Sequence, residues 1–359
     1  MQRAMRLAVR GLYTTDPNPR VGCVIVNDDG VIVGEDFHKR TGEQHAEILA
    51  LQQAGDAAAG ATAYVTLEPC SHYGRTPPCA DALVNAGVRR MVAAMQDPNP
   101  LVAGRGFERL RDNDIEVEYG LLESQALALN PGFVKRMQSG LPFVRVKLAM
   151  SLDGRTAMAS GESQWITGEA ARRDVQKLRA RSSVILTGIN TVLHDNPSLN
   201  VRLSAGELGI DGDVRQPLRV VIDSGLKMPA DAKMLTLVGD TVVVTPPGNT
   251  ATLPCEVVSV EAVNGKVNLV ELMAWLARRE ANEVHVEAGA GLCGALLQQR
   301  LVDEIVVYMA PHIMGANARG LFELPGLERM QDRIGLEIID LRHIGKDIRI
   351  TARPLYDQQ

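Results

Sequence analysis

Apolar runs of strand length alternate with segments of helical apolar spacing through the N-terminal part of the chain. Two β-rich runs within residues 21–37 surround Asp29 and Gly30, a pair that favours a hairpin turn. Segment 45–55 has helical spacing and ends at a glycine, which is typical of a helix stop. A hairpin followed by such alternation predicts a sheet with helices on both faces. Further strands are predicted at ATAYVTLEP, RRMVAAM and IEVEYG, and further helices at residues 79–87, 103–113 and 121–130.

A second α/β pattern begins at Pro142. Strands are predicted there at FVRVKLAMS, SSVILTG, LRVVIDS, TVVVTPP, EVHVEAG and EIVVYMAP. The preceding segment, NPGFVKRMQSGLP, is rich in residues that break regular structure, and we predict a linker there. A chain of 359 residues is also long for one domain. We therefore expect two α/β domains, residues 1–141 and 142–359.

Composition narrows the function classes. Apolar residues make up 45% of the chain and charged residues 23%, which is ordinary for a globular protein. No apolar run is long enough for a membrane span, and the arginine-containing N-terminus predicts an amphipathic helix instead of a secretory signal. The net charge of −5 argues against a nucleic-acid partner. We expect a cytoplasmic protein with neither a membrane nor a nucleic-acid partner.

Two of the five cysteines, Cys70 and Cys79, lie close together in EPCSHYGRTPPC. They could form a disulfide, bind a metal, or be neighbours by chance. An odd cysteine count without a secretory signal favours reduced thiols. His45 precedes them, so one nitrogen and two thiolates are available, which is the ligand set of a catalytic zinc with one open position. Both cysteines lie near a predicted helix start, where the helix dipole favours the thiolate.

Glu47 is the candidate proton carrier of this site. A carboxylate beside a catalytic zinc can take a proton from water and pass it to a leaving amine. The zinc deaminase signature is H-x-E…P-C-x-x-C, but here eight residues separate the cysteines. A structural zinc closed by His72 as fourth ligand is an alternative. His45 and Glu47 do not share a helix face, so the site must lie over the start of their helix.

The motifs HAE, TLEPCSHYGRTPPC and QDPNP resemble the deaminase half of the bifunctional riboflavin-biosynthesis deaminase/reductases, in which a long spacer separates the cysteines. The second half resembles the reductase through KLAMSLDGRTA, SGESQWIT, GINTVLHDNPSLNVR, VIDS and VEAG. The resemblance covers nearly the whole chain. It implies an N-terminal cytidine-deaminase-like three-layer αβα domain and a C-terminal dihydrofolate-reductase-like α/β domain.

The resemblance also implies two consecutive reactions on a small phosphorylated pyrimidine. The first is zinc-dependent hydrolytic deamination of 2,5-diamino-6-ribosylamino-4(3H)-pyrimidinone 5′-phosphate, with one zinc per chain. The second is NADPH-dependent reduction of the ribosyl side chain to ribityl. We also expect a homo-oligomer, a dimer or a tetramer.

Five residues around the zinc motif match family positions that hold ribose, phosphate and ring. Arginine suits phosphate, and the other side chains can pair with hydroxyls and ring edges. Without the family, the aspartate and the second asparagine could simply form a turn with Pro98 and Pro100. The five are Asn18, His38, Arg75, Asp97 and Asn99.

The second half contains Gly289-x-Gly291-x-x-Gly294 between a predicted strand and a helix, which matches the dinucleotide fingerprint. The next strand lacks the acidic residue that would hold a ribose, and a Rossmann domain usually places this motif at its first strand. A true Rossmann fold is therefore disfavoured. The glycines can still bring backbone N–H groups up to a phosphate.

By resemblance, the cofactor and substrate residues of this half fall into two sets. Without the resemblance, Trp165 would be interpreted as a core residue and each of the two arginines, Arg179 and Arg202, as a solvated side chain. Lys147 and Glu287 are charges in buried strand patterns, which is costly unless they are paired or functional; Lys147 could polarise the sugar carbonyl. The NADPH set is Ala149, Trp165, Thr191, Asp195, Ser224, Gly289, Ala290, Gly291, Leu292, Cys293, Gly294 and Ala295, and the substrate set is Lys147, Ser163, Arg179, Leu199, Arg202 and Glu287.

Overall fold

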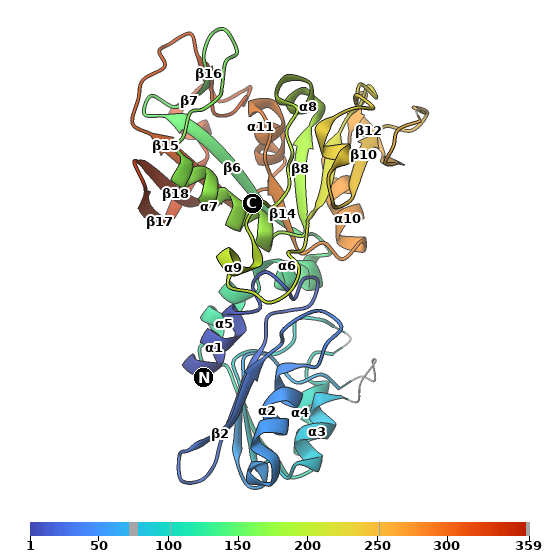
Figure 1. Cartoon of the computed structure of the whole chain (residues 1–359), viewed down its shortest axis with the longest axis vertical. Helices are drawn as coiled ribbons and strands as arrows, with labels where there is room; N and C mark the ends of the chain where they lie inside the picture. Colours follow the sequence, from blue (N-terminus) through green and yellow to red (C-terminus); the bar gives the residue numbers. More distant parts are fainter. Residues whose placement is uncertain (72–77, 101, 251, 357–359) are drawn as a thin grey trace. The chain divides into compact units, whose positions relative to one another are not determined.

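The computed structural model describes residues 1–71, 78–100, 102–250 and 252–356. The chain divides into two compact units, Met1–Leu141 and Pro142–Gln359 (Figure 1). No helix among the described residues is both long and apolar enough to span a membrane.

The first unit is built on a five-stranded sheet with the order β2-β1-β3-β4-β5. The predicted hairpin joins β1 and β2, and Gly30 in its turn has a φ of 78°, the left-handed region that glycine enters without strain. The strand β3 pairs antiparallel with β1 and parallel with β4, which pairs parallel with β5. The strands are β1 (Gly22–Val26), β2 (Ile32–Phe37), β3 (Thr62–Val65), β4 (Arg90–Ala93) and β5 (Glu116–Tyr119).

Helices cover both faces of this sheet, which confirms the predicted three-layer arrangement. On one face, α2, α3 and α4 bury side chains such as Ala50, Leu83 and Phe107 against Ile25 and Met91. A second cluster joins α1, α5 and α6 to the segments that follow β3 and β4. The helices are α1 (Gln2–Val9), α2 (Ala46–Ala54), α3 (Cys79–Asn85), α4 (Arg105–Arg111), α5 (Glu123–Leu129) and α6 (Pro131–Ser139), with a 3₁₀ turn at Gly55–Ala58.

The linker predicted before Pro142 is wrong for most of its length, because α6 occupies it. Pro131 stands at the first turn of α6, where its missing N–H costs nothing, and Gly140 ends the helix with a φ of 69°. The breaking residues therefore frame a helix. Val134 packs with Met5 in the first unit.

The second unit is built on a nine-stranded sheet with the order β11-β10-β9-β8-β14-β6-β15-β18-β17. Neighbouring strands are parallel from β11 to β15, whereas β18 and β17 are antiparallel additions at one edge. The strands are β6 (Phe143–Ser151), β8 (Val184–Gly188), β9 (Leu218–Ile222), β10 (Thr241–Thr245), β11 (Glu256–Ser259), β14 (Glu283–Val286), β15 (Glu304–Ala310), β17 (Gly335–Ile344) and β18 (Asp347–Leu355).

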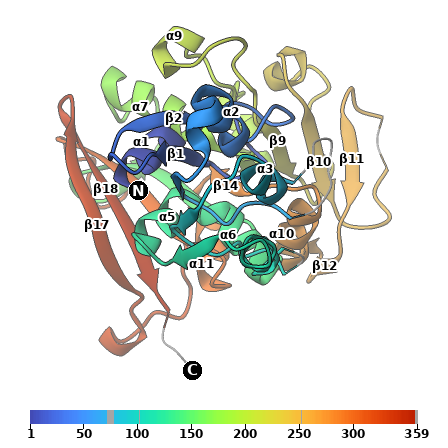
Figure 2. The same ribbon diagram turned by 90° about the horizontal axis from the view of Figure 1, so that it is seen from below.

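Every strand predicted after Pro142 is present in this sheet. Figure 2 shows α7 on one face of it and α10 and α11 on the other. The helices are α7 (Glu169–Arg181), α8 (Ile189–Asp195), α9 (Ala205–Leu208), α10 (Leu269–Arg278) and α11 (Ala290–Gln298), with 3₁₀ turns at Lys233–Thr236 and Met330–Asp332. Short two-stranded ribbons pair β7 (Arg155–Ala157) with β16 (Arg319–Gly320), and β12 (Ala262–Val263) with β13 (Lys266–Val267).

The two ends of the parallel strands differ in chemistry. At the amino ends of β6 and β14, Arg145 pairs with Glu283 at 2.9 Å, and both side chains are almost fully buried. Glu304 of β15 and Arg181 of α7 complete this ion-pair network. At the carboxyl ends lie Glu287 and the glycine turn that opens α11. Ligands of open α/β sheets bind at the carboxyl ends of the strands.

Candidate active sites

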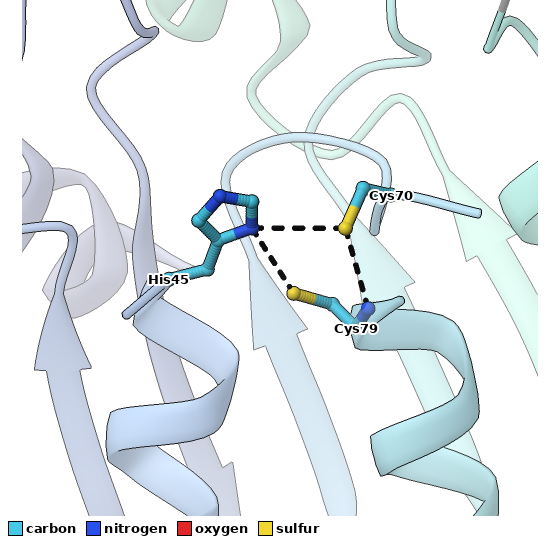
Figure 3. Close-up of side chains that lie close together, drawn as sticks. All are labelled: His45, Cys70 and Cys79. Carbon is cyan, nitrogen blue, oxygen red and sulfur yellow. Dashed lines mark hydrogen bonds between the residues drawn. The ribbon is translucent and has the colours of Figure 1, made fainter. Parts of the chain in front are cut away.

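His45, Cys70 and Cys79 come together in the first unit (Figure 3). His45 is the residue before α2, and Cys79 is the first residue of α3, while Cys70 follows β3. The Nδ1 atom of His45 lies 3.2 Å from Sγ of Cys79 and 3.6 Å from Sγ of Cys70. All three candidate ligand atoms lie within 4.8 Å of one another.

These distances fit a shared zinc ion. In a tetrahedral site, ordinary zinc–nitrogen and zinc–sulfur bond lengths place the two ligand atoms about 3.6 Å apart. The thiolate that zinc requires is favoured at Cys70, whereas the hydrogen bond to Cys70 and burial raise the pKa of Cys79. Hydrogen bonds from the Cys79 thiol and from His45 lower the pKa of Cys70 to about 4, although burial opposes this. His72, the alternative fourth ligand, and Arg75 lie outside the described residues.

Glu47 lies in the first turn of α2, beside this cluster. Its side chain is 3% exposed, and its Oε2 atom has no hydrogen-bond partner among the described residues. Burial raises the pKa of Glu47, and its carboxylate interacts electrostatically with His45 and Cys70. His45 has an extended backbone, with φ −72° and ψ 162°, so it is not yet part of the helix. This explains how residues two apart reach the same site.

Asn18 and His38 lie against the same cluster. Nδ1 of His38 is 3.1 Å from the carbonyl oxygen of Gln44, and Nε2 is 3.2 Å from Nδ2 of Asn18. Nδ1 therefore carries the proton, and Nε2 accepts from the asparagine amide. Burial lowers the pKa of His38, which favours the neutral ring. Its ring meets that of His45 edge to face, with centroids 5.4 Å apart.

Asp97 and Asn99 form a turn, as the alternative interpretation expects. Oδ1 of Asp97 accepts a hydrogen bond from the backbone N–H of Asn99 at 2.8 Å. The turn is also tied to the zinc motif, because the N–H of Asp97 donates to Glu68, two residues before Cys70. The sequence interpretation missed Glu68, although an acidic residue at the end of a buried strand was a usable signal.

Asn130 was also missed, because it lay in the predicted linker. Its side-chain amide accepts from the backbone N–H of Arg20 at 2.8 Å and donates to the carbonyl of the same residue at 3.0 Å. This pair of bonds fixes the loop that carries Asn18 to the start of α6.

In the second unit, Glu287 is the centre of a charged cluster. Val146 of β6 pairs with Val286 of β14, so Lys147 and Glu287 follow on neighbouring strands. Arg179 of α7 donates two hydrogen bonds to the carboxylate of Glu287, from Nε to Oε1 at 2.5 Å and from Nη2 to Oε2 at 2.9 Å. Although burial opposes ionisation, Arg179 lowers the pKa of Glu287 well below its usual value. Burial lowers the pKa of Lys147.

The loop that follows α8 contributes further residues to this cluster. Nη1 of Arg179 donates to the carbonyl of Asn200 at 2.9 Å. Leu199, next to it, is buried with a φ of 42°. Burial, together with the positive charge of Arg179, lowers the pKa of Arg202. Arg179 therefore contacts Glu287 directly, while Lys147 and Arg202 interact with it electrostatically. The structure also places His285, which the sequence interpretation missed, 3.3 Å from Glu287.

The predicted cofactor turn begins α11. Gly289 is the residue before the helix. A Cβ on Gly294 would meet the backbone oxygen of Glu323 at 2.1 Å, so close packing explains this glycine. The turn faces the start of α8, because a Cβ on Gly188 would contact Leu292 at 3.6 Å. Burial raises the pKa of Cys293 to about 12, so this thiol stays protonated.

The remaining predicted residues of this half occupy different elements. Thr191 and Asp195 lie on α8, and Ser224 follows β9, where its hydroxyl accepts from the N–H of Val267 at 3.3 Å. Trp165 is 71% exposed and stacks on Arg172, whose guanidinium lies 4.6 Å from the ring centre. The alternative of a core tryptophan is therefore wrong. Ala149 lies on β6, and Ser163 lies on the loop of Trp165, between β7 and α7.

Two family models match the chain. "RibD C-terminal domain" matches residues 142–350, and "Cytidine and deoxycytidylate deaminase zinc-binding region" matches residues 1–95. Among curated proteins, the riboflavin biosynthesis protein RibD of Escherichia coli is 52% identical over 97% of this chain and 96% of its own length. The protein of the same name from Haemophilus influenzae is 51% identical over 99% and 96% of the two chains.

Solved structures give the same result. Acinetobacter baumannii RibD superposes with a TM-score of 0.90 at 45% identity, covering 99% of this chain and 98% of that one. A Thermotoga maritima structure has a TM-score of 0.87 at 31% identity, covering 99% and 97%. That protein is described as a diaminohydroxyphosphoribosylaminopyrimidine deaminase and 5-amino-6-(5-phosphoribosylamino)uracil reductase.

Proposed function

Because this chain belongs to the RibD family of bifunctional riboflavin-biosynthesis enzymes, we propose how its two units share the two reactions and which residues carry out each. The chain is a deaminase and a reductase, with zinc and NADPH as cofactors. Residues 1–141 form the deaminase and residues 142–359 the reductase in this proposal. The observation that carries it is a zinc-type ligand triad beside the buried Glu47, whose Oε2 atom has no hydrogen-bond partner among the described residues.

The proposed substrate of the deaminase is 2,5-diamino-6-ribosylamino-4(3H)-pyrimidinone 5′-phosphate. His45, Cys70 and Cys79 would hold the zinc, which as a Lewis acid would make water nucleophilic near neutral pH. Oε2 of Glu47 accepts a proton from the attacking water and returns it to the departing 2-amino group. The new C–O bond replaces the C–N bond, and ammonia leaves. The buried position of Glu47 keeps its carboxylate away from competing solvent.

Substrate orientation falls to the residues around the triad. His38 and Asn18 hold each other beside His45, so both are fixed before the substrate arrives. Asp97 and Asn99 are proposed to bind the ribose and ring. Arg75 is proposed to bind the phosphate.

For the reductase, the proposed substrate is the deaminated product, and NADPH supplies the hydride. Nζ of Lys147 donates a hydrogen bond to the sugar carbonyl oxygen, while Glu287 holds a neighbouring hydroxyl. Because Arg179 spends three donors on Glu287 and Asn200, Arg202 is the freer of the two guanidinium groups for phosphate. Ser163 and Leu199 complete the proposed substrate contacts. The proposed NADPH contacts are Ala149, Trp165, Thr191, Asp195, Ser224 and the turn 289–295.

Mass spectrometry of the products tests this function directly. We expect the purified chain to convert the diaminopyrimidine substrate to its deaminated product when NADPH is omitted. Addition of NADPH should then give a second product that is heavier by two hydrogen atoms. Reduction before deamination, or no reaction in either condition, would contradict the proposed order.

The homo-oligomer expected from the sequence is also part of this proposal, and the edge strand β17 supports it. A bulge between Ile338 and Asp340 keeps Leu341 on the same face as Leu336 and Ile338. These three side chains are between 49% and 61% exposed, and β17 is the outermost strand of the sheet (Figure 2). Long exposed apolar edge strands are usually paired or covered. We propose that this β17 face contacts a second copy of the chain in a dimer or tetramer.

Substitution of Leu341 by aspartate should disrupt this contact, because a charge would have to be buried in an apolar interface. We expect the wild-type chain to elute as a dimer or tetramer and the Leu341→Asp chain to shift toward the monomer. Light scattering coupled to gel filtration measures the mass. Val238→Asp is the matched control, since Val238 is exposed elsewhere in the same unit. Equal masses for wild type and Leu341→Asp would exclude this face as the interface.

A further inference from the structure

Glu68 is a buried carboxylate that the proposed chemistry does not use. It precedes Pro69 and Cys70, and its side chain is only 3% exposed. It accepts three hydrogen bonds from backbone N–H groups of another segment. Asp97 and Gly104 donate to Oε2 at 3.1 and 3.0 Å, and Gly106 donates to Oε1 at 2.8 Å.

Two of the donors, Asp97 and Gly104, belong to the segment that connects β4 to α4, and the third, Gly106, lies in α4 itself. The described part of this segment before α4 is irregular, so its N–H groups cannot be satisfied by a strand partner. Gly106 lies in the first turn of α4, where backbone N–H groups lack helical partners. A carboxylate that accepts several N–H groups makes strong, charge-assisted bonds. Glu68 therefore organises both the turn of Asp97 and the start of α4.

Two glycines allow this close approach. A Cβ on Gly106 would lie 2.1 Å from the backbone oxygen of Pro69 and 3.0 Å from Oε1 of Glu68. Gly104 has a φ of 82°, a conformation that alanine adopts only with strain. The segment is thus shaped to fit around Glu68.

We propose that Glu68 is a positioning residue of the deaminase, which holds the substrate-binding turn at a fixed distance from the zinc ligand Cys70. The backbone of Glu68 is joined to Cys70 through a single residue, Pro69, and its side chain accepts a hydrogen bond from the N–H of Asp97. Asp97 in turn accepts from the N–H of Asn99. This inference rests on the proposed function, in which Asp97 and Asn99 contact the substrate.

The Glu68→Gln variant tests the role. Glutamine keeps the shape but loses the charge, and its NH₂ group would face backbone N–H donors, so at least one bond is lost. We expect kcat/KM for deamination to fall about 10- to 100-fold, mainly through a higher KM. Zinc content and reduction of the deaminated compound should stay at wild-type values. Glu108→Gln, on the exposed side of α4, is the matched control and should change nothing.

Gly104→Ala is a second, milder variant that strains the same segment and leaves Glu68 intact. It should raise the deaminase KM several-fold with zinc retained, and it decides the matter if the Glu68→Gln chain is insoluble. An unchanged KM in the soluble variants, or loss of zinc together with activity, would overturn the inference.

Asn99→Ala separates this inference from the proposed function. If Asn99→Ala raises KM while Glu68→Gln does not, only the positioning role fails. If Asn99→Ala and Asp97→Ala both leave KM unchanged, the substrate contacts themselves are wrong, and the positioning role falls with them.

Discussion

Replacing Cys79 with alanine should remove zinc and abolish deamination, while reduction of the deaminated compound continues. Two ligands remain in that variant, and a catalytic zinc site requires three protein ligands. The fold should survive, because alanine is a good helix former and Cys79 begins α3. Metal analysis of protein purified without added zinc should fall from about one zinc per chain to near zero. The deamination rate should fall at least about a hundredfold.

Cys23→Ala is the matched control, since Cys23 is a fully buried cysteine of the same unit that lies outside the ligand cluster. That variant should keep its zinc. Full zinc in Cys79→Ala would show that the ligand assignment is wrong. A chelator applied to the wild type should also silence only deamination. If zinc removal abolishes reduction as well while the chain stays folded, the two sites are not independent.

Glu47→Gln should reduce deamination by about a hundredfold or more while zinc stays bound. Glutamine preserves the size of the side chain but cannot accept and return a proton. The measurement is the deamination rate together with zinc content, and the reductase half serves as an internal control. Glu123→Gln, exposed in the first turn of α5, should behave like the wild type. A Glu47→Gln chain that deaminates at the wild-type rate would leave the proposed mechanism without its proton carrier.

The metal centre could be predicted because its ligands are recognisable by residue type and order. The sequence spacing of His45 and Glu47 would place the two side chains on different faces of one helix. The structure removes this difficulty, because His45 precedes the helix. Spacing counts assume that both residues are helical. Only backbone angles show that one of them is not.

Glu68 and Asn130 could not be predicted in the same way. Their importance comes from bonds to the backbone of distant segments, and any residue supplies such N–H groups and carbonyls. No pattern of side chains marks those partners. In the second unit, Arg179 and Glu287 are 108 positions apart and meet because strand order places β14 in the middle of the sheet. Strand order depends on the whole chain.

The place of α6 has a practical consequence for protein engineering. Because side chains of α6 pack in the first unit and Asn130 holds the loop of Asn18, a chain intended to fold as the first unit alone has to include this helix. A chain truncated after α5 would expose the side chains that pack with Val134, such as Met5. It would also lose the hydrogen bonds between Asn130 and Arg20 that hold the loop of Asn18. To exchange one unit for that of a relative, the chains should be joined between Gly140 and Pro142, because α6 has ended there and β6 has not begun.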